Sequence, residues 1–376
     1  MKKKLSILIH SLAAGGAERV VSILLHELND KYHITLFLLN DTIFYDIPKN
    51  IKIVYLDNSL ETESGIQKLL KLPLLAWKYK KLNDSEISLS FMYRPNYINI
   101  LARMMTMASK VIISERAMPS LQHKNGLQGF VNKILIKTLY KKADIITANS
   151  LGNSQDLKVN FDCNNIITIN NPFDINKIQR LKQENIEFRD EQFTFITVGR
   201  LDSGKNHKLL IEAMKSIDAK LYVIGDGKLR KEIEEQIIDN NLQNNIILLG
   251  MQQNPYKYLA QADCFMFSSL NEGFPNVLVE ALACGLPIIS TDCESGPREI
   301  LAPSSNMNFK LQNGIEICTY GVLTPINSID NLTQAMNLLI NDQKLRNSYK
   351  EKAIQRAMEF NTSIVMKQII HTIENA

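Results

Sequence analysis

The chain has 376 residues, of which 45% are hydrophobic and 22% charged, with 16 Gly and 11 Pro. These ordinary globular values exclude a collagen-like or disordered chain and fit two domains of typical size. The net charge of +4 is uneven, because residues 1–170 carry 22 Lys and Arg against 14 Asp and Glu, whereas residues 171–376 carry 21 against 25. A basic first half indicates an anionic partner (a membrane surface, a nucleic acid or a phosphorylated substrate), although scattered solubilising lysines would give the same count.

The N-terminus combines three lysines with an apolar run that is too short for a signal peptide and lacks a small-residue cleavage pattern, so we expect a first strand there. No apolar run reaches the ~18 residues that span a bilayer. The five cysteines are odd in number and form no CxxC pair. This favours a reducing compartment, without a disulfide framework or a zinc site.

Short apolar runs alternate with helical patterns along the whole chain. In the first half, strands are predicted at 5–10, 33–39, 51–56, 87–92, 110–114 and 144–148, and a helix at 17–28. A polar stretch at 164–191 is predicted to connect the halves. In the second half, strands are predicted at 193–198, 219–224, 245–249, 264–268 and 286–290, with helices at 205–216, 328–358 (broken near Asp342) and 363–374. The alternation predicts an α/β fold of two Rossmann-like, doubly wound units.

Ligands of such sheets bind at the carboxyl ends of the strands, so the residues that follow each strand are the most informative. Gly15 and Gly16 follow the first strand and precede a helix. Paired glycines let the backbone approach a ligand, and the helix N-terminus offers N–H groups to an anion. A tight turn alone would also explain them. GxGxxG is absent from the sequence, which counts against a nicotinamide dinucleotide enzyme.

Two cations follow the first strand of the second half. Arg200 and Lys205 stand at opposite ends of a glycine-containing loop before a predicted helix. An Arg and a Lys beside a helix N-terminus suit a diphosphate, although two surface cations are the alternative.

A third segment pairs two carboxylates. Glu272 lies in a loop, and Glu280 lies about one turn inside an apolar helix, where a carboxylate is costly unless it is hydrogen-bonded. A ribose diol would supply the donors, and the backbone of 273–276 offers amides at the helix start. The alternative is one exposed and one helix-face glutamate.

These segments resemble the GT4-like family of retaining GT-B glycosyltransferases. The resemblance covers nearly the whole chain and rests on GGAERV at 15–20, VGRLDSGKN at 198–206, GDGKLR at 225–230, NEGFPNVLVEALACGLP at 271–287 and YGVLTP at 320–325. It implies a GT-B fold with two Rossmann-like domains facing a cleft. The first domain would comprise residues 1–170 plus about 361–376, and the second, donor-binding domain residues 171–360.

The resemblance also implies roles for single residues. Arg200 and Lys205 would bind the nucleotide diphosphate, Glu280 the ribose and Glu272 the donor sugar. The remaining donor-binding positions would be Gly15, Gly16, Gly250, Met251, Gly273, Phe274, Pro275 and Asn276. A UDP-sugar would be the donor substrate, and neither a cofactor nor a catalytic metal is expected.

One position departs from the family pattern. Many relatives carry a His after a Ser-Glu pair, whereas this chain reads Ser114-Glu115-Arg116. Arg cannot act as a general base at neutral pH. Arg116 would instead contact the acceptor, and Glu115 is left between an acceptor role and a structural one.

Within that family, the chain is most similar to bacterial N-acetylgalactosaminyltransferases that extend diacetylbacillosamine-containing glycans on undecaprenyl diphosphate in N-linked protein glycosylation. The segments that carry this similarity are LKLPLLAWKYKKL at 70–82, RPNYINILARM at 94–104, GRLDSGKNHKLLI at 199–211 and NPYKYLAQAD at 254–263. It implies a UDP-GalNAc donor and a polyprenyl-diphosphate-linked glycan acceptor.

The segment 65–82 is the most membrane-like part of the chain. Apolar residues including Trp77 are interleaved with Lys68, Lys71, Lys78, Lys80 and Lys81. A basic amphipathic segment can lie in the interface of an anionic membrane, and some of its lysines could reach an acceptor diphosphate. An ordinary core-packing helix with a lysine edge is the alternative. Arg94 is a further acceptor candidate.

These observations predict a hexosyltransferase of protein N-glycosylation or surface polysaccharide assembly, cytoplasmic and peripheral on the inner membrane. Two alternatives are a UDP-sugar 2-epimerase-like enzyme and a non-catalytic glycan-binding or assembly protein. No nucleic-acid partner is expected, because the cations form no aromatic-interleaved stripe.

Overall fold

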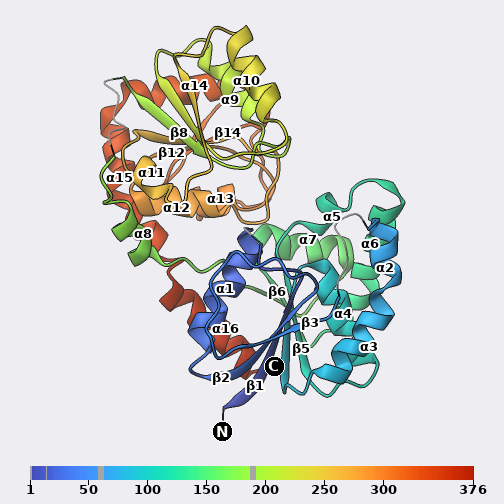
Figure 1. The fold of residues 1–376 in the computed structure, drawn as a ribbon. Helices are drawn as coiled ribbons and strands as arrows, with labels where there is room; N and C mark the ends of the chain where they lie inside the picture. The colour runs from blue at the N-terminus through green and yellow to red at the C-terminus, as the bar shows by residue number, and fades with distance from the viewer. Residues whose placement is uncertain (1, 14, 58–62, 187–191) are drawn as a thin grey trace. The chain divides into compact units, whose positions relative to one another are not determined.

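The computed structural model describes residues 2–13, 15–57, 63–186 and 192–376. The chain divides into two compact units. Unit 1 comprises Met1–Pro172 and Ser363–Ala376, and unit 2 comprises Phe173–Thr362. Each unit has a seven-stranded sheet with helices packed on it (Figure 1).

The sheet of unit 1 is parallel throughout, in the order β3-β2-β1-β4-β5-β6-β7. Its strands are β1 Lys3–Ile9, β2 Tyr32–Leu38, β3 Lys52–Tyr55, β4 Ile87–Phe91, β5 Lys110–Glu115, β6 Ile145–Ala148 and β7 Ile166–Thr168. Its helices are α1 Gly16–Leu28, α2 Gly65–Leu70, α3 Leu72–Leu82, α4 Tyr93–Met104, α5 Pro119–Gln122, α6 Gly126–Leu139, the 3₁₀ turn η1 Tyr140–Lys142, α7 Leu151–Phe161 and α16 Thr362–Glu374.

The central strands β1, β4 and β5 of unit 1 are buried over most of their length because helices cover both faces of the sheet. On one face, α1 and the C-terminal helix α16 pack together through side chains such as Leu24 and Ile369. On the other face, α3, α4 and α6 contribute Tyr79, Tyr97 and Ile136 to a second core. The C-terminal helix therefore belongs to unit 1, beside α1 (Figure 1).

The sheet of unit 2 has the order β10-β9-β8-β11-β12-β14-β13, with only β13 antiparallel to its neighbour. Its strands are β8 Thr194–Val198, β9 Lys220–Ile224, β10 Ile246–Gly250, β11 Cys264–Phe267, β12 Ile288–Thr291, β13 Glu316–Ile317 and β14 Val322–Thr324. Its helices are α8 Ile175–Leu181, α9 His207–Met214, α10 Arg230–Asp239, α11 Tyr256–Leu259, α12 Asn276–Cys284, α13 Pro297–Leu301, α14 Ile329–Asn341 and α15 Gln343–Met358.

The predicted elements match these with boundary shifts of one or two residues. Asp342 breaks the long closing segment as expected, because its side chain accepts a hydrogen bond from the N–H of Leu345 and caps α15. The polar stretch 164–191 connects the two units as predicted, because the chain divides at Pro172, but it also contains β7 and α8. Its residues 187–191 lie outside the described part of the chain.

Both sheets have a topological switch point, where the strand order reverses and the connections that follow two adjacent strands cross to opposite faces of the sheet. In unit 1 it lies between β1 and β4, and in unit 2 between β8 and β11. The loops that follow β8 and β11 contain Arg200, Lys205 and Glu272. Among the described residues, no helix combines the length and hydropathy needed to cross a membrane.

Candidate functional site

The centre of the candidate site in unit 2 is an ion pair between the loops that follow β8 and β11. Lys205 Nζ lies 2.5 Å from Glu272 Oε1, and the two side chains are 27% and 14% exposed. The ammonium also lies 5.8 Å from the ring centroid of Phe267 at the end of β11. The hydroxyl of Ser268 donates to the carbonyl of Lys205 at 2.7 Å, which ties the two loops together. The structure thus brings together Lys205, the residue predicted to bind the diphosphate, and Glu272, the residue predicted to bind the sugar.

The second predicted cation, Arg200, lies on the same loop but is 76% exposed. Its Nε is 3.3 Å from Asp202 Oδ2, and the other oxygen of Asp202 accepts a 3.1 Å hydrogen bond from the N–H of Lys205. Asp202 therefore links both ends of the loop, a partner that the sequence reasoning missed.

The segment Gly225-Asp226-Gly227 packs against the backbone of this loop. A Cβ at Gly225, whose φ is +143°, would lie 1.9 Å from the carbonyl oxygen of Gly199. The N–H of Leu201 donates to the carbonyl of Asp226 at 3.0 Å. Gly225 is therefore required both by its backbone conformation and by the close approach of two chains.

The loop before α12 is fixed by residues that follow β12. The hydroxyl of Ser295 donates to the carbonyl of Gly273 at 2.7 Å, and the N–H of Glu272 donates to the carbonyl of Glu294 at 3.2 Å. A Cβ at Gly296, with φ +96°, would lie 2.1 Å from Pro275 Cδ. Sequence reasoning missed this support, although a Ser-Gly pair shortly after a predicted strand could have indicated it.

Helix α12 begins at Asn276 without a side-chain cap, and the N-terminus of a helix favours a nearby anion. Phe274 packs inward beside this end. Glu280 lies one turn into the helix and is 6% exposed. Its Oε1 accepts a 3.1 Å hydrogen bond from the hydroxyl of Tyr256 in α11. The buried carboxylate is therefore hydrogen-bonded, as expected for a group that would be costly without partners.

The predicted base-binding pair, Gly250 and Met251, ends β10. Gly250 has φ +68°, and Met251 is 73% exposed. The guanidinium of Arg230 lies near Gly250, 3.7 Å from the position of a Cβ there. The exposed thioether of Met251, at the carboxyl edge of the sheet, could contact the ring of a nucleotide base.

His207, the first residue of α9, is 4% exposed and its Nδ1 has no hydrogen-bond partner in the described structure. Burial, and after it the neighbouring charge of Lys205, lower the pKa of His207 from 6.5 to about 4. The imidazole is therefore neutral at physiological pH and packs against the loop that carries Arg200 and Lys205.

In unit 1, the turn at Gly15 and Gly16 joins β1 to α1. The hydroxyl of Tyr45 donates to the carbonyl of Gly15 at 3.1 Å, and the N–H of Gly15 donates to the carbonyl of Ala13 at 2.8 Å. Gly16 opens α1, so the helix N-terminus lies directly behind the turn.

Three predicted acceptor residues of unit 1 are Arg94, which follows β4, and Lys68 and Lys71, which lie in and directly after α2. The guanidinium of Arg94 is 6% exposed and pairs with Asp57 at 3.2 Å. Its Nε and Nη1 are buried without a hydrogen-bond partner in the described residues. Lys71 Nζ lies 3.7 Å from the other oxygen of Asp57 and also pairs with Glu63. Lys68 lies near enough to His10 to help lower the pKa of the imidazole, after burial and Arg94.

Glu115 and Arg116 are more enclosed than the sequence indicated. Glu115 is 2% exposed and accepts hydrogen bonds from the hydroxyl of Tyr140 (2.6 Å) and the N–H of Arg116 (2.9 Å). Arg116 lies over the ring of Phe91 at 5.0 Å and donates to Asn171 at 2.7 Å. Burial lowers the pKa of Arg116 to about 10, and the Glu115 carboxylate opposes that shift. Both side chains therefore have internal partners.

The remaining lysines of α3 are peripheral. Lys78 and Lys81 are exposed, and Lys81 Nζ lies 5.7 Å from the ring centroid of Trp77, itself 51% exposed. Lys80 donates to the hydroxyl of Thr106 at 3.0 Å. In the described part of the chain, none of these three lysines forms an ion pair or hydrogen bond with Arg94 or Asp57, and they lie at the outer edge of the helix.

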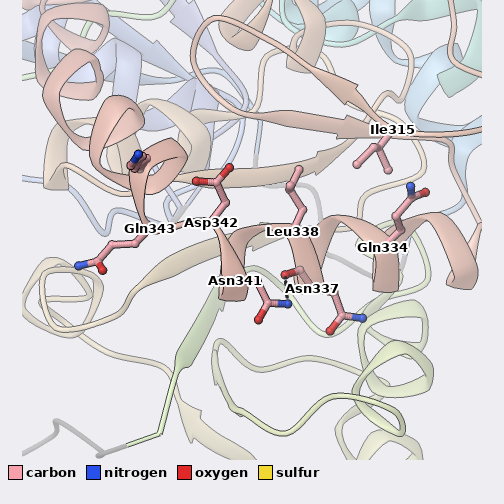
Figure 2. Close-up of a pocket in the computed structure, with 8 residues that line it drawn as sticks. Ile315, Gln334, Asn337, Leu338, Asn341, Asp342 and Gln343 are labelled. Atoms are coloured by element: carbon pink, nitrogen blue, oxygen red, sulfur yellow. Dashed lines mark hydrogen bonds between the residues drawn. The ribbon is translucent and has the colours of Figure 1, made fainter.

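An open groove of about 760 Å³ lies elsewhere in unit 2, along α14 and the start of α15 (Figure 2). Gln334, Asn337, Asn341 and Asp342 line it, with none of the predicted site residues. Across the described residues, no group of three or more His, Cys, Asp or Glu side chains is placed to hold a metal ion.

Solved structures with the same architecture identify the fold of this chain. Anabaena Alr3699/HepE in complex with UDP and glucose superposes with a TM-score of 0.78 at 20% identity, over 100% of both chains. Sucrose-phosphate synthase from Thermosynechococcus elongatus superposes with a TM-score of 0.83 at 16% identity, over 99% of both chains. Two doubly wound units of this kind constitute the GT-B fold of glycosyltransferases.

The sequence comparisons are more specific. The model of the family "Glycosyl transferases group 1" matches residues 179–356. A Campylobacter jejuni protein named N-acetylgalactosamine-N,N'-diacetylbacillosaminyl-diphospho-undecaprenol 4-alpha-N-acetylgalactosaminyltransferase is 40% identical over 366 residues, or 95% of this chain and 96% of the relative. An uncharacterized glycosyltransferase of Methanocaldococcus jannaschii is 36% identical over 69% of this chain and 70% of its own. The chain belongs to the group 1 glycosyl transferases and is an enzyme of that class.

Proposed function

We propose that this enzyme transfers N-acetylgalactosamine from UDP-GalNAc to a glycan carried on polyprenyl diphosphate, with retention of the anomeric configuration. The observation that carries the proposal is the 40% identity, over 95% of the chain, to the Campylobacter jejuni transferase named above. A second Campylobacter jejuni enzyme, named for transfer of N-acetylgalactosamine to a related undecaprenol-linked glycan, is 23% identical over 99% of the chain.

The donor half of the proposal is supported by the Lys205 and Glu272 pair beside α12. The ammonium of Lys205, the guanidinium of Arg200 and the first amides of α12 would stabilise the charge that develops on the leaving diphosphate. Glu272 would hydrogen-bond hydroxyls of the sugar, and Glu280 those of the ribose. Phe274, Pro275 and Asn276 would hold sugar and phosphate. The structure of HepE with UDP belongs to a protein with the same fold.

The chemical step is a displacement at the anomeric carbon. The acceptor hydroxyl oxygen forms the new glycosidic bond on the face from which UDP departs, the bond from the anomeric carbon to the diphosphate oxygen breaks, and the hydroxyl proton passes to the leaving diphosphate. No protein base is required, which is consistent with Arg116 and a buried Glu115 at the position where relatives carry a His.

The acceptor half is assigned to unit 1. Arg94 and Lys71 would form a cationic cluster suited to a diphosphate. Among the described residues, Nε and Nη1 of Arg94 are buried without a hydrogen-bond partner, and Lys71 pairs with Asp57 and Glu63. The lysines of α2 and α3 would hold the enzyme at the cytoplasmic face of the inner membrane, where a polyprenyl diphosphate is embedded. This attachment is peripheral.

The test is to incubate the enzyme with UDP-GalNAc, UDP-GlcNAc or UDP-Gal and a lipid-diphosphate oligosaccharide that ends in N-acetylgalactosamine. We expect transfer from UDP-GalNAc, with an α-linked product. Preferred transfer from another donor would overturn the sugar assignment. Conversion of a UDP-sugar without acceptor would support an epimerase instead, and UDP or glycan binding without turnover would indicate a non-catalytic protein.

A further inference from the structure

Two groups of exposed apolar side chains lie on neighbouring helices of unit 1. On α2 and α3 they are Ile66, Leu70, Leu74 and Trp77, spaced as one stripe across the break at Lys71. On α6 they are Leu127, Phe130 and Ile134, between 47% and 69% exposed. The second group was not anticipated from the sequence.

The α6 group is a stripe on one face of the helix, since positions three and four residues apart lie above one another. The opposite face carries Asn132 and Ile136, which are buried in unit 1. The exposed stripe is therefore not required for folding of the described chain.

The two groups belong to adjacent helices. Gly65, the first residue of α2, lies against Gln128 near the start of α6, because a Cβ at Gly65 would meet that side chain at 2.1 Å. Figure 1 draws α2 and α6 next to each other at the edge of unit 1. We call the exposed residues of α2, α3 and α6 together the apolar face.

The two segments that contain the apolar face are rich in lysine. Residues 64–83 contain five Lys and no Asp or Glu, and so do residues 117–143. Of the lysines near α6, Lys137 and Lys141 share the carboxylate of Asp162, at 3.1 Å and 3.6 Å. Apolar side chains within a lysine-rich surface match an anionic lipid interface, since each Lys adds attraction to acidic headgroups.

We propose that α6 docks on an anionic bilayer, with Leu127, Phe130 and Ile134 entering the boundary between headgroups and acyl chains beside α2 and α3. This inference rests on the proposed lipid-linked acceptor, and it extends the membrane contact from one basic segment to a three-helix surface. Docking would hold unit 1 at the depth of a polyprenyl diphosphate.

The experiment uses the variant Leu127→Ser, Phe130→Ser and Ile134→Ser of the full chain. Its control is Met104→Ser, Val159→Ser and Ile167→Ser, three similarly exposed positions of unit 1 outside the apolar face. Binding to phosphatidylcholine vesicles, with and without phosphatidylglycerol, is measured by co-sedimentation. Trp77, the single tryptophan, reports insertion through the blue shift of its emission and quenching by brominated lipid.

We expect wild type and control to bind the anionic vesicles, and the α6 variant to bind at least about ten-fold more weakly, a change of about 1.4 kcal/mol. Equal binding by the α6 variant would overturn the proposal. So would concentration-dependent dimerisation of the wild type that the variant abolishes without any loss of vesicle binding, since the stripe would then be a protein interface.

Transfer to a short-chain, water-soluble acceptor separates this proposal from the proposed function. The α6 variant is expected to retain it at the wild-type level. If the wild type also fails to transfer to any acceptor, the proposed function fails, while vesicle binding still decides the role of α6.

Discussion

Lys205 Nζ and Glu272 Oε1 lie 2.5 Å apart, although the two residues are separated by 67 positions in the sequence. The parallel arrangement of β8 and β11 makes this possible, because the loops after both strands emerge at the same edge of the sheet. An ion pair that is partly exposed can exchange partners at little cost, so a diphosphate can take over the ammonium while Glu272 turns to sugar hydroxyls.

Lys205→Ala should weaken UDP binding, because a charge-assisted hydrogen bond to the diphosphate is lost. Such bonds contribute about 1.5–3 kcal/mol, which corresponds to roughly a 10- to 100-fold rise in Kd. Isothermal titration calorimetry with UDP measures it. Lys208→Ala is the matched control, since Lys208 is on the same segment but pairs with Glu232 at the surface. Unchanged UDP affinity in Lys205→Ala would remove Lys205 from its assigned role.

Glu280→Gln should weaken binding of UDP about ten-fold through loss of a charged hydrogen bond to the ribose. Binding of 2',3'-dideoxy-UDP should be nearly equal in wild type and variant, because the diol is absent. If the variant loses the same factor for both nucleotides, Glu280 acts through its bond with Tyr256 and the packing of α12 rather than through the ribose.

Gly225→Ala should disturb the loop that carries Arg200 and Lys205, since the added Cβ would lie 1.9 Å from the carbonyl oxygen of Gly199. Gly314→Ala provides the control, because Gly314 also has a positive φ (+77°) but open space around its Cβ position. We expect UDP affinity to fall strongly only for Gly225→Ala, measured by calorimetry on folded protein. Equal losses of stability and affinity in both variants would mean that backbone strain alone explains the effect.

The sequence predicted the parts of the site that follow strands, because hydrophobic runs locate β8 and β11 and the polar residues after them stand out. It did not predict the residues that hold the Glu272 loop in place. Ser295 donates a hydrogen bond to the carbonyl of Gly273, and Gly296 lies directly against Pro275. Contacts of this kind depend on how two loops meet in space and have no residue pattern of their own.

The fold was predicted from periodicity, and the errors lie where burial is incomplete. β7 is three residues long and no residue in it is fully buried. It therefore lacks the alternation of polar and apolar residues by which a strand is recognised, and it was not distinguished from the polar residues around it. Tyr140 was not predicted as a functional partner, because a buried aromatic residue is ordinary in a core. Its hydroxyl has a role only because the Glu115 carboxylate accepts a hydrogen bond from it.

His207 should make stability fall at acidic pH. Burial lowers the pKa of His207 from 6.5 to about 4, so its contribution is present above pH 6.5 and is lost as the pH falls through that window toward 4. The loss amounts to about 3 kcal/mol at most. Urea unfolding of wild type and His207→Gln, followed by circular dichroism at pH 7.5, 6 and 5, measures it. Parallel curves for wild type and His207→Gln would contradict the prediction.

Tyr140→Phe should destabilise unit 1, because the buried Glu115 carboxylate and the amide of Asn96 each lose a partner. We expect a loss of about 1–3 kcal/mol at pH 7.5, measured by urea unfolding with Trp77 fluorescence. Tyr55→Phe, at a half-exposed position, is the control.

The pH dependence identifies the carboxylate as the cause. Burial raises the pKa of Glu115, whereas the bond from Tyr140 lowers it, so the phenylalanine variant raises it further. A raised pKa in the folded state means that stability is greatest below the unfolded value of 4.5 and falls as the pH rises through the folded value. The penalty of Tyr140→Phe should therefore be smaller at pH 4.5 than at pH 7.5, and it should lose this pH dependence in a Glu115→Gln background. A penalty that is the same at both pH values would mean that Tyr140 acts through packing and Asn96, not through the charge of Glu115.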